Sequence, residues 1–92
     1  MDEPNTSVLE IEKIPVSGSS ISGYVAIATI NRPNKLNALN AEVMESLKAL
    51  CTWVESNAEI RCLVITGAEP LPAEEGKRAK PNAFVAGADI SE

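Results

Sequence analysis

The sequence predicts an α/β fold built from an antiparallel hairpin, one amphipathic helix, a parallel third strand and a short fourth strand. Two aliphatic runs, at residues 24–30 and 61–66, flank a segment whose apolar residues recur at helical spacing. A strand, a helix and a strand over this distance form a right-handed βαβ unit with parallel strands. An alternating run at residues 8–14 precedes them across a segment rich in Ser and Gly, which is typical of a hairpin loop.

The first strand is predicted at residues 8–14, where leucine and isoleucine fall on one side and two glutamates on the other. This alternation is typical of a strand with one wet face at a sheet edge. Residues 1–7 are polar, so we expect a disordered N-terminus followed by a domain at residues 8–92. The second strand, residues 24–30, is apolar on both faces, which indicates a strand covered on both sides.

A helix is predicted from Asn40, a good N-cap residue, to about Asn57. Its apolar residues form one stripe at helical spacing, namely Val43, Met44, Leu47, Leu50, Cys51 and Val54. Trp53 lies on the flank of this stripe, and we expect it to be partly buried.

The third strand, residues 61–66, is apolar almost throughout and ends at Gly67. Residues 68–82 are rich in proline and charge, which predicts a long surface loop. The closing stretch from Ala83 predicts a short strand and a Gly-Ala turn, followed by a helix with Asp89 as its N-cap. Strand, turn and helix in this order leave backbone N–H groups available to an anion or a polarised carbonyl.

The composition excludes several classes of function. A net charge of −5 without a basic run argues against nucleic-acid binding and against attraction to anionic membranes. No apolar run reaches the ~18 residues of a membrane helix, and the acidic N-terminus is untypical of a signal or transit peptide. Two cysteines and no histidine predict no metal site and reduced thiols. We expect a soluble intracellular protein, with the cytoplasm favoured and the mitochondrion and peroxisome left open.

Three blocks of the sequence resemble the enoyl-CoA hydratase/isomerase (crotonase) superfamily. The blocks are Ile30–Pro33 continued by Leu36–Asn40, then Cys62–Gly67, then Ala83–Ile90. The blocks follow the family's order, and the match as a whole runs from about residue 8 to residue 92, which corresponds to the N-terminal third of such proteins. The resemblance implies a partial crotonase-like ββαβ spiral unit and a homo-oligomer, a trimer or hexamer in the family. Apolar strands and an apolar helix stripe in so short a chain also favour self-association.

The resemblance further implies a site for an acyl-CoA thioester, in a lyase or isomerase of fatty acid metabolism. Coenzyme A would be part of the substrate, with no separate cofactor. The backbone N–H of Ala88 would be the first of two donors of an oxyanion hole. Two groups would line the coenzyme A pocket, Ala86, Gly87, Asp89 and Ile90 on one wall and Asn34, Lys35, Leu36 and Ala38 on the other.

The sequence departs from the family pattern in three respects. No residues match the second oxyanion donor or the two downstream catalytic glutamates, and the loop at residues 68–82 is longer than usual. We therefore expect the isolated 92-residue chain to be inactive. A non-catalytic binding or oligomer-forming module derived from this fold stays open, as does whether the chain is naturally short. Arg32 and Lys35 are equally compatible with solvated loop charges and with contacts to coenzyme A phosphates.

Overall fold

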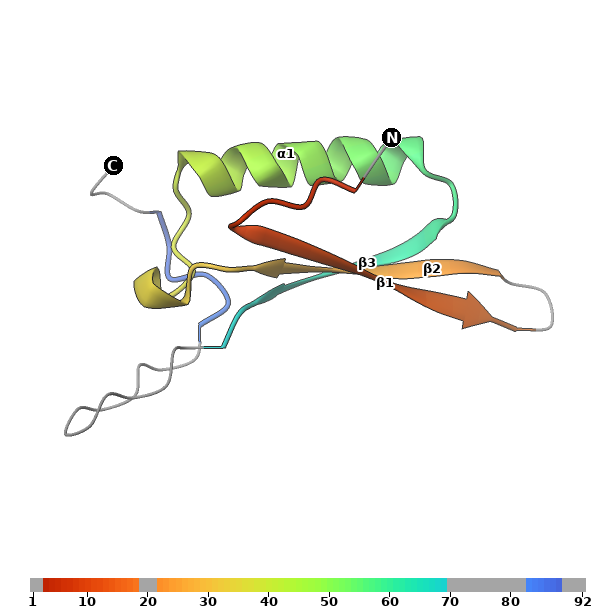
Figure 1. Cartoon of the computed structure of the whole chain (residues 1–92), viewed down its shortest axis with the longest axis horizontal. Helices are drawn as coiled ribbons and strands as arrows, with labels where there is room; N and C mark the ends of the chain where they lie inside the picture. The colour runs from red at the N-terminus through yellow and green to blue at the C-terminus, as the bar shows by residue number, and fades with distance from the viewer. Residues whose placement is uncertain (1–2, 19–21, 70–82, 89–92) are drawn as a thin grey trace.

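The computed structural model describes residues 3–18, 22–69 and 83–88 (Figure 1). The elements follow in the order β1 (Leu9–Ser17), β2 (Ser22–Ile30), the 3-10 turn η1 (Pro33–Lys35), α1 (Ala41–Ser56) and β3 (Ile60–Gly67). The strands form one sheet in the order β1-β2-β3, in which β2 pairs antiparallel with β1 and parallel with β3. The predicted hairpin, helix and parallel third strand are confirmed.

The hairpin is longer than the sequence predicts. Its pairing continues past Ile14 to Pro15 opposite Tyr24 and Ser17 opposite Ser22. Proline is tolerated here because β1 lies at the edge of the sheet, where not every N–H joins the ladder. The composition of residues 15–23 therefore predicts the position of the loop correctly, but the predicted loop is too long.

The described part of the N-terminus, residues 3–7, makes defined contacts where disorder was predicted. The Thr6 hydroxyl lies 3.1 Å from the Ser46 hydroxyl of α1. Asn5 Oδ1 accepts a 2.7 Å hydrogen bond from the backbone N–H of Ile11. Small polar side chains thus attach this segment to both β1 and α1, which a reading of polarity alone does not anticipate.

The helix begins and ends where the sequence predicts. Asn40 is the N-cap, and its Oδ1 accepts from the Val43 N–H at 2.9 Å. Asn57 is the C-cap, and its N–H donates to the Val54 carbonyl. No helix within the described residues is long and apolar enough to cross a membrane.

The buried side of α1 differs from the predicted stripe. Met44 is 54% exposed and Cys51 is exposed, whereas Trp53 is only 1% exposed. The buried positions are Val43, Ser46, Leu50 and Trp53, with Leu47 and Val54 packed beside them. These positions also follow helical spacing, and the large indole decides which of two overlapping stripes faces the sheet. The small residues Ala26 and Ala28 of β2 belong to the same core and leave volume for it.

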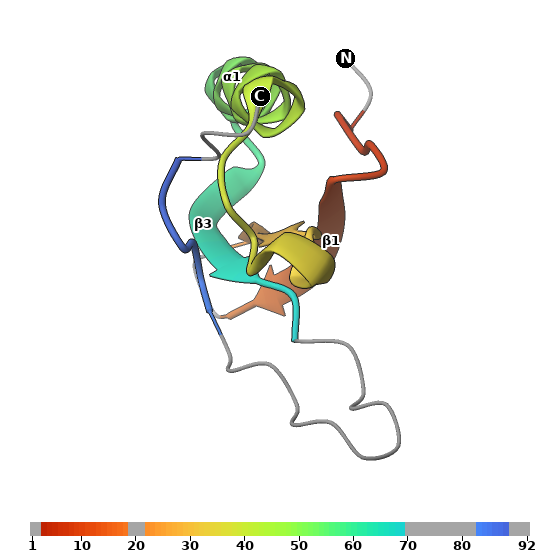
Figure 2. The ribbon, with the colours of Figure 1, turned by 90° about the vertical axis from the view of Figure 1, so that its left-hand side faces the viewer.

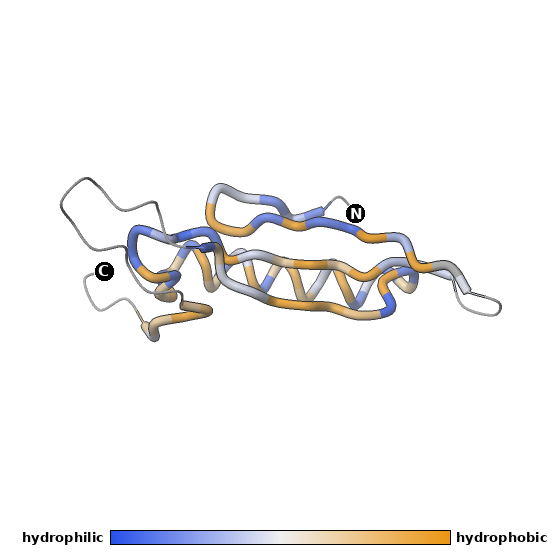
Figure 3. Tube along the Cα trace, turned by 90° about the horizontal axis from the view of Figure 1, so that it is seen from below, coloured by the Kyte–Doolittle hydropathy of each residue, from blue (hydrophilic) through white to orange (hydrophobic). Residues whose placement is uncertain are grey.

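Among the described residues, only one face of the sheet is covered, although β2 was predicted to be covered on both sides. Figures 1 and 2 show α1 lying over a single face. Figure 3 shows the sheet from below, with hydrophobic residues prominent along β2 and β3. On the uncovered face Val25 and Ile27 are half-buried, while Ile14 and Val64 remain 41% and 42% exposed. One helix has too little surface to cover both faces of three strands.

The predicted fourth strand does not form within residues 83–88. This segment makes one isolated parallel bridge, between Leu39 and Ala88, and otherwise has no regular structure. Its partner is an irregular loop rather than a sheet edge, and the positive φ of Gly87, 113°, interrupts an extended conformation. The rest of the predicted long loop, residues 70–82, lies outside the described residues.

Candidate functional site

The loop after β2 and the segment 83–88 lie side by side near the carboxyl ends of β2 and β3 (Figure 1). The Ala86 N–H donates to the Leu36 carbonyl at 3.1 Å, and the Leu39 N–H donates to the Gly87 carbonyl at 2.7 Å. Several residues predicted to form a site are therefore brought together from distant parts of the sequence, namely Leu36, Ala38, Ala86, Gly87 and Ala88.

The loop itself is folded tightly by its own backbone. The Arg32 carbonyl accepts from the N–H groups of Lys35 and Asn37, at 2.9 and 2.8 Å. Leu36 and Asn37 have φ of 53° and 58°, the left-handed region that non-glycine residues seldom adopt. Arg32 Nη1 also donates to the Ala38 carbonyl at 2.6 Å. This guanidinium is thus engaged in shaping the loop, whereas Lys35 is exposed on η1.

Asn37 joins the three segments that meet at the site, although the sequence did not identify it as a site residue. Its side chain is only 1% exposed, and its Oδ1 accepts from the Arg32 N–H at 2.9 Å. Its Nδ2 donates to the Ala68 carbonyl at 3.0 Å and to the Ala83 carbonyl at 2.7 Å. Asparagine suits this position because it tolerates the left-handed region and carries both a donor and an acceptor.

Gly67 allows the segment 83–88 to cross the end of β3. A Cβ on Gly67 would lie 2.5 Å from the Ala83 carbonyl oxygen and 2.6 Å from that of Phe84. It would also lie 2.7 Å from Asn37 Nδ2. All three distances are shorter than real Cβ contacts, so only glycine permits this close backbone approach. The sequence indicated Gly67 only as the end of a strand.

The peptide between Gly87 and Ala88 has a defined direction. Its carbonyl accepts from Leu39, and no cis peptide occurs among the described residues. In a trans peptide the N–H points opposite to the C=O, so the Ala88 N–H points away from the loop. No hydrogen bond within residues 3–18, 22–69 and 83–88 uses this N–H, and Ala88 is exposed. The arrangement offers one backbone donor to an incoming oxygen.

The remaining predicted site residues occupy less informative positions. Asn34 and Lys35 are exposed on η1. Asp89 and Ile90, with the proposed helix cap, lie outside the described residues. Within the described part of the chain, no group of three or more His, Cys, Asp or Glu side chains could hold a metal ion.

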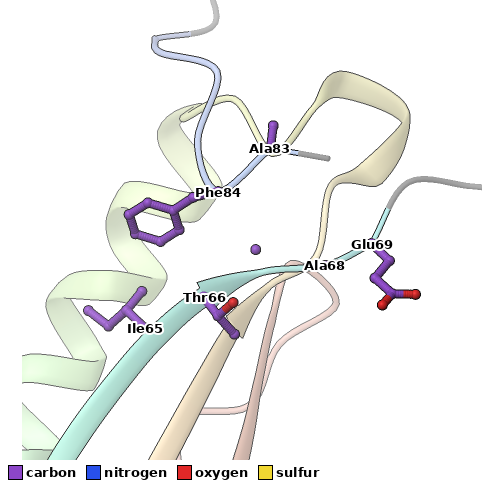
Figure 4. Close-up of a pocket in the computed structure, with 7 residues that line it drawn as sticks. Ile65, Thr66, Ala68, Glu69, Ala83 and Phe84 are labelled. Carbon is purple, nitrogen blue, oxygen red and sulfur yellow. The ribbon is translucent and has the colours of Figure 1, made fainter. Parts of the chain in front are cut away.

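A hollow of about 420 Å³ opens next to this loop (Figure 4). It is lined by Ile65, Thr66, Gly67, Ala68, Glu69, Ala83 and Phe84. Figure 4 shows Phe84 and Ile65 on one side of the hollow and Glu69 on the other. The apolar end suits hydrocarbon, while the carboxylate disfavours a phosphate there. None of the residues predicted for the site lines this hollow.

Sequence comparison with known proteins agrees with the resemblance described above. A family model described as enoyl-CoA hydratase/isomerase matches residues 25–92. A short-chain-enoyl-CoA hydratase of Clostridium acetobutylicum is 40% identical over 70 residues, which are 76% of this chain and 23% of the relative. A mevalonyl-coenzyme A hydratase of Beauveria bassiana is 38% identical over 69 residues, 75% of this chain and 20% of the relative.

Solved structures share the arrangement of elements. A probable enoyl-CoA hydratase/isomerase from Mycobacterium abscessus superposes with a TM-score of 0.65 at 28% identity, over 95% of this chain and 27% of that one. A carnitinyl-CoA dehydratase from Mycobacterium avium gives a TM-score of 0.59 at 29% identity, over 87% and 25%. The chain thus spans 20 to 27% of the length of these four proteins.

Proposed function

The chain belongs to the enoyl-CoA hydratase/isomerase family, and from this we propose that it supplies one oxyanion-hole donor and part of a coenzyme A pocket for an acyl-CoA thioester. The observation that carries the proposal is the direction of the Ala88 N–H. The carbonyl of the 87–88 peptide accepts a hydrogen bond from the Leu39 N–H, and the Ala88 N–H has no acceptor among the described residues. The relatives' own substrates, named as coenzyme A thioesters, agree with such a ligand.

A thioester oxygen gains negative charge when its carbonyl is attacked or enolised. A backbone N–H that is already oriented stabilises this charge without reorganisation, and removing one such donor typically costs about 3 to 4 kcal/mol. The hydrogen bond from Leu39 to the Gly87 carbonyl polarises the same peptide, which strengthens the Ala88 N–H as a donor. The group cannot titrate, so its contribution does not depend on pH.

The pocket walls are proposed on either side of this donor. Leu36 and Ala38 are half-buried in the loop, and Ala86 and Gly87 are exposed beside them. Their small or apolar character suits the pantetheine arm. The family resemblance adds Asp89 and Ile90 to this group, and both lie outside the described residues. The exposed ammonium of Lys35 is a candidate contact for a coenzyme A phosphate. Coenzyme A enters as part of the substrate, and the proposal requires no separate cofactor.

Titration of the 15N-labelled chain with crotonyl-CoA is expected to shift the amide signal of Ala88, with weaker shifts at Leu39 and Ala86. Coenzyme A without the acyl group is the matched control, because it lacks the thioester oxygen and should leave the Ala88 amide unshifted. We expect a Kd of ~1 mM or weaker, since the chain provides only part of a pocket. Hydration of crotonyl-CoA should stay at background.

An unshifted Ala88 amide at saturating crotonyl-CoA would refute the oxyanion proposal. A hydration rate clearly above background would refute the expectation that the isolated chain is inactive, since no residue of this sequence corresponds to the second donor or to the catalytic glutamates of the family.

The uncovered apolar face supports a second candidate, an oligomer-forming module. On this face Ile14 and Val64 are 41% and 42% exposed, which is unfavourable for a monomer in water. We propose that copies of the chain associate through the face of the sheet opposite α1. Trimers or hexamers, as the family resemblance implies, are the expected assemblies.

Light scattering should report a mass above the 9.8 kDa monomer. Val64→Lys should reduce that mass, because a charge on the uncovered face opposes its burial. Met44→Lys, on the outer side of α1, is the matched control and should leave the assembly intact. A folded monomer at every concentration would contradict self-association.

A further inference from the structure

We infer that Asn37 is a positioning residue, whose side chain sets the direction of the Ala88 N–H before any ligand binds. The functional meaning of this inference rests on the proposed oxyanion role of Ala88. That Asn37 fixes the local backbone does not depend on this role, because it follows from the hydrogen bonds around Asn37.

Each polar atom of the Asn37 carboxamide has a hydrogen-bond partner. Both hydrogens of Nδ2 have carbonyl acceptors, Ala68 and Ala83, while Oδ1 accepts from Arg32. A buried amide in such a position is stabilising when every group is paired and strongly destabilising when one is not. An apolar side chain at this buried position would leave the Ala68 and Ala83 carbonyls and the Arg32 N–H without these partners.

The effect of Asn37 reaches Ala88 through three successive anchors. The Asn37 side chain donates to the Ala83 carbonyl. The Ala86 N–H donates to the carbonyl of the adjacent Leu36, and the Leu39 N–H donates to the Gly87 carbonyl. The left-handed backbone of Asn37 turns the loop between the last two anchors. Fixing the chain at residues 83, 86 and 87 leaves the 87–88 peptide little freedom to rotate.

Gly67 makes this arrangement possible but cannot impose it. Its missing side chain leaves room for the Ala83 and Phe84 carbonyls, but contributes no bond to them. Arg32 acts within the loop, through its bond to the Ala38 carbonyl. Among the described residues, Asn37 is the side chain that bonds to the loop, to the end of β3 and to the segment 83–88.

Asn37→Asp is the sharpest test. Aspartate keeps the shape, the tolerance for the left-handed region and the acceptor for Arg32. It removes both donors and places a carboxylate oxygen where Nδ2 lies 2.7 and 3.0 Å from two carbonyl oxygens. Asn57→Asp is the matched control, because it makes the same charge change at the far end of α1, where Oδ1 accepts from Glu59.

Two measurements on the ligand-free, 15N-labelled chain report the result. In Asn37→Asp, hydrogen exchange at the Leu39 and Ala86 amides should accelerate by about tenfold to a hundredfold, the effect of losing two hydrogen bonds. Exchange at Leu50 in α1 should change little. The residual dipolar coupling of the Ala88 N–H should also collapse, because the peptide loses its fixed direction. Asn57→Asp should match the wild type in both measurements.

Unchanged exchange at Leu39 and Ala86, with an unchanged Ala88 coupling, would overturn the inference. If Asn37→Asp also loses protection at Leu50, the domain has unfolded and two further results decide. Asn37→Gly keeps the left-handed freedom without the carboxamide and should release Ala88 locally. In the wild type, a scalar coupling between Asn37 Nδ2 and the Ala83 carbonyl carbon should be present, and its absence would refute the positioning bond.

The two proposals can fail independently. The crotonyl-CoA titration tests whether Ala88 meets a thioester oxygen, whereas exchange and dipolar couplings test what holds Ala88 without ligand. A fixed Ala88 N–H that ignores crotonyl-CoA would remove the function and keep the positioning role.

Discussion

Replacing Trp53 with alanine is expected to lower the free energy of unfolding by about 3 to 5 kcal/mol, the usual cost of emptying a buried aromatic site. Trp53 is 1% exposed and belongs to the core formed with Leu9, Val43 and Leu50. Small domains have only about 5 to 15 kcal/mol of stability in total, so the variant should be close to unfolded. Urea denaturation followed by far-ultraviolet circular dichroism measures the loss, because the substitution removes the only tryptophan.

Met44→Ala is the matched control on the same helix. Met44 is 54% exposed, so its replacement should change the free energy of unfolding by no more than about 0.5 kcal/mol. Equal losses for Trp53→Ala and Met44→Ala would contradict the observed orientation of α1 and would restore the stripe that periodicity alone predicts.

Replacing Gly67 with alanine is expected to detach the segment 83–88 from the end of β3. The new Cβ would meet two backbone carbonyl oxygens, at 2.5 and 2.6 Å, and backbone cannot move aside as cheaply as a side chain. Forcing an extra carbon into a filled site usually costs about 1 to 3 kcal/mol, comparable with the few hydrogen bonds that hold the segment. Exchange at the Leu39 and Ala86 amides should therefore rise to rates near those of an open chain.

Gly87→Ala separates crowding from backbone strain. Nothing lies within 4 Å of a Cβ at Gly87, so its cost comes only from φ +113°. The variant should disturb the 87–88 peptide and leave the Asn37 bond to the Ala83 carbonyl intact. If Gly67→Ala keeps wild-type exchange at Leu39 and Ala86, then the approach of the two carbonyls is looser than the geometry indicates.

The parts of the fold that local sequence determines were predictable. Asn40 and Asn57 bound the helix as expected, because a cap satisfies backbone groups within its own turn. The alternation in β1 likewise gave its buried side, with Leu9 fully buried and Glu10 and Glu12 exposed. The buried face of α1 was not predictable in the same way, because two overlapping stripes satisfy the period and the volume of Trp53 selects between them.

The sequence predicts a candidate site only where it resembles a motif. The Ala-Gly-Ala block indicated Ala88, but Asn37 and Gly67 act through contacts between residues that are far apart in the sequence. A third asparagine in a loop that already has a proline indicates a turn, and nothing local shows that its amide reaches Ala68 and Ala83. The fourth strand was predicted wrongly for a related reason, since its partner is a loop whose conformation the apolar run cannot reveal.

Asn37 Nδ2 donates to two carbonyls. One belongs to Ala68, where the chain leaves β3, and the other belongs to Ala83, where the chain returns to the site. The two ends of the intervening connection are therefore fastened together independently of what lies between them. The entropic cost of closing such a connection grows only with the logarithm of its length, about 0.6 kcal/mol for each doubling. Insertions and deletions between residues 69 and 82 can thus accumulate in evolution, or be introduced by engineering, without moving the turn that carries Ala88.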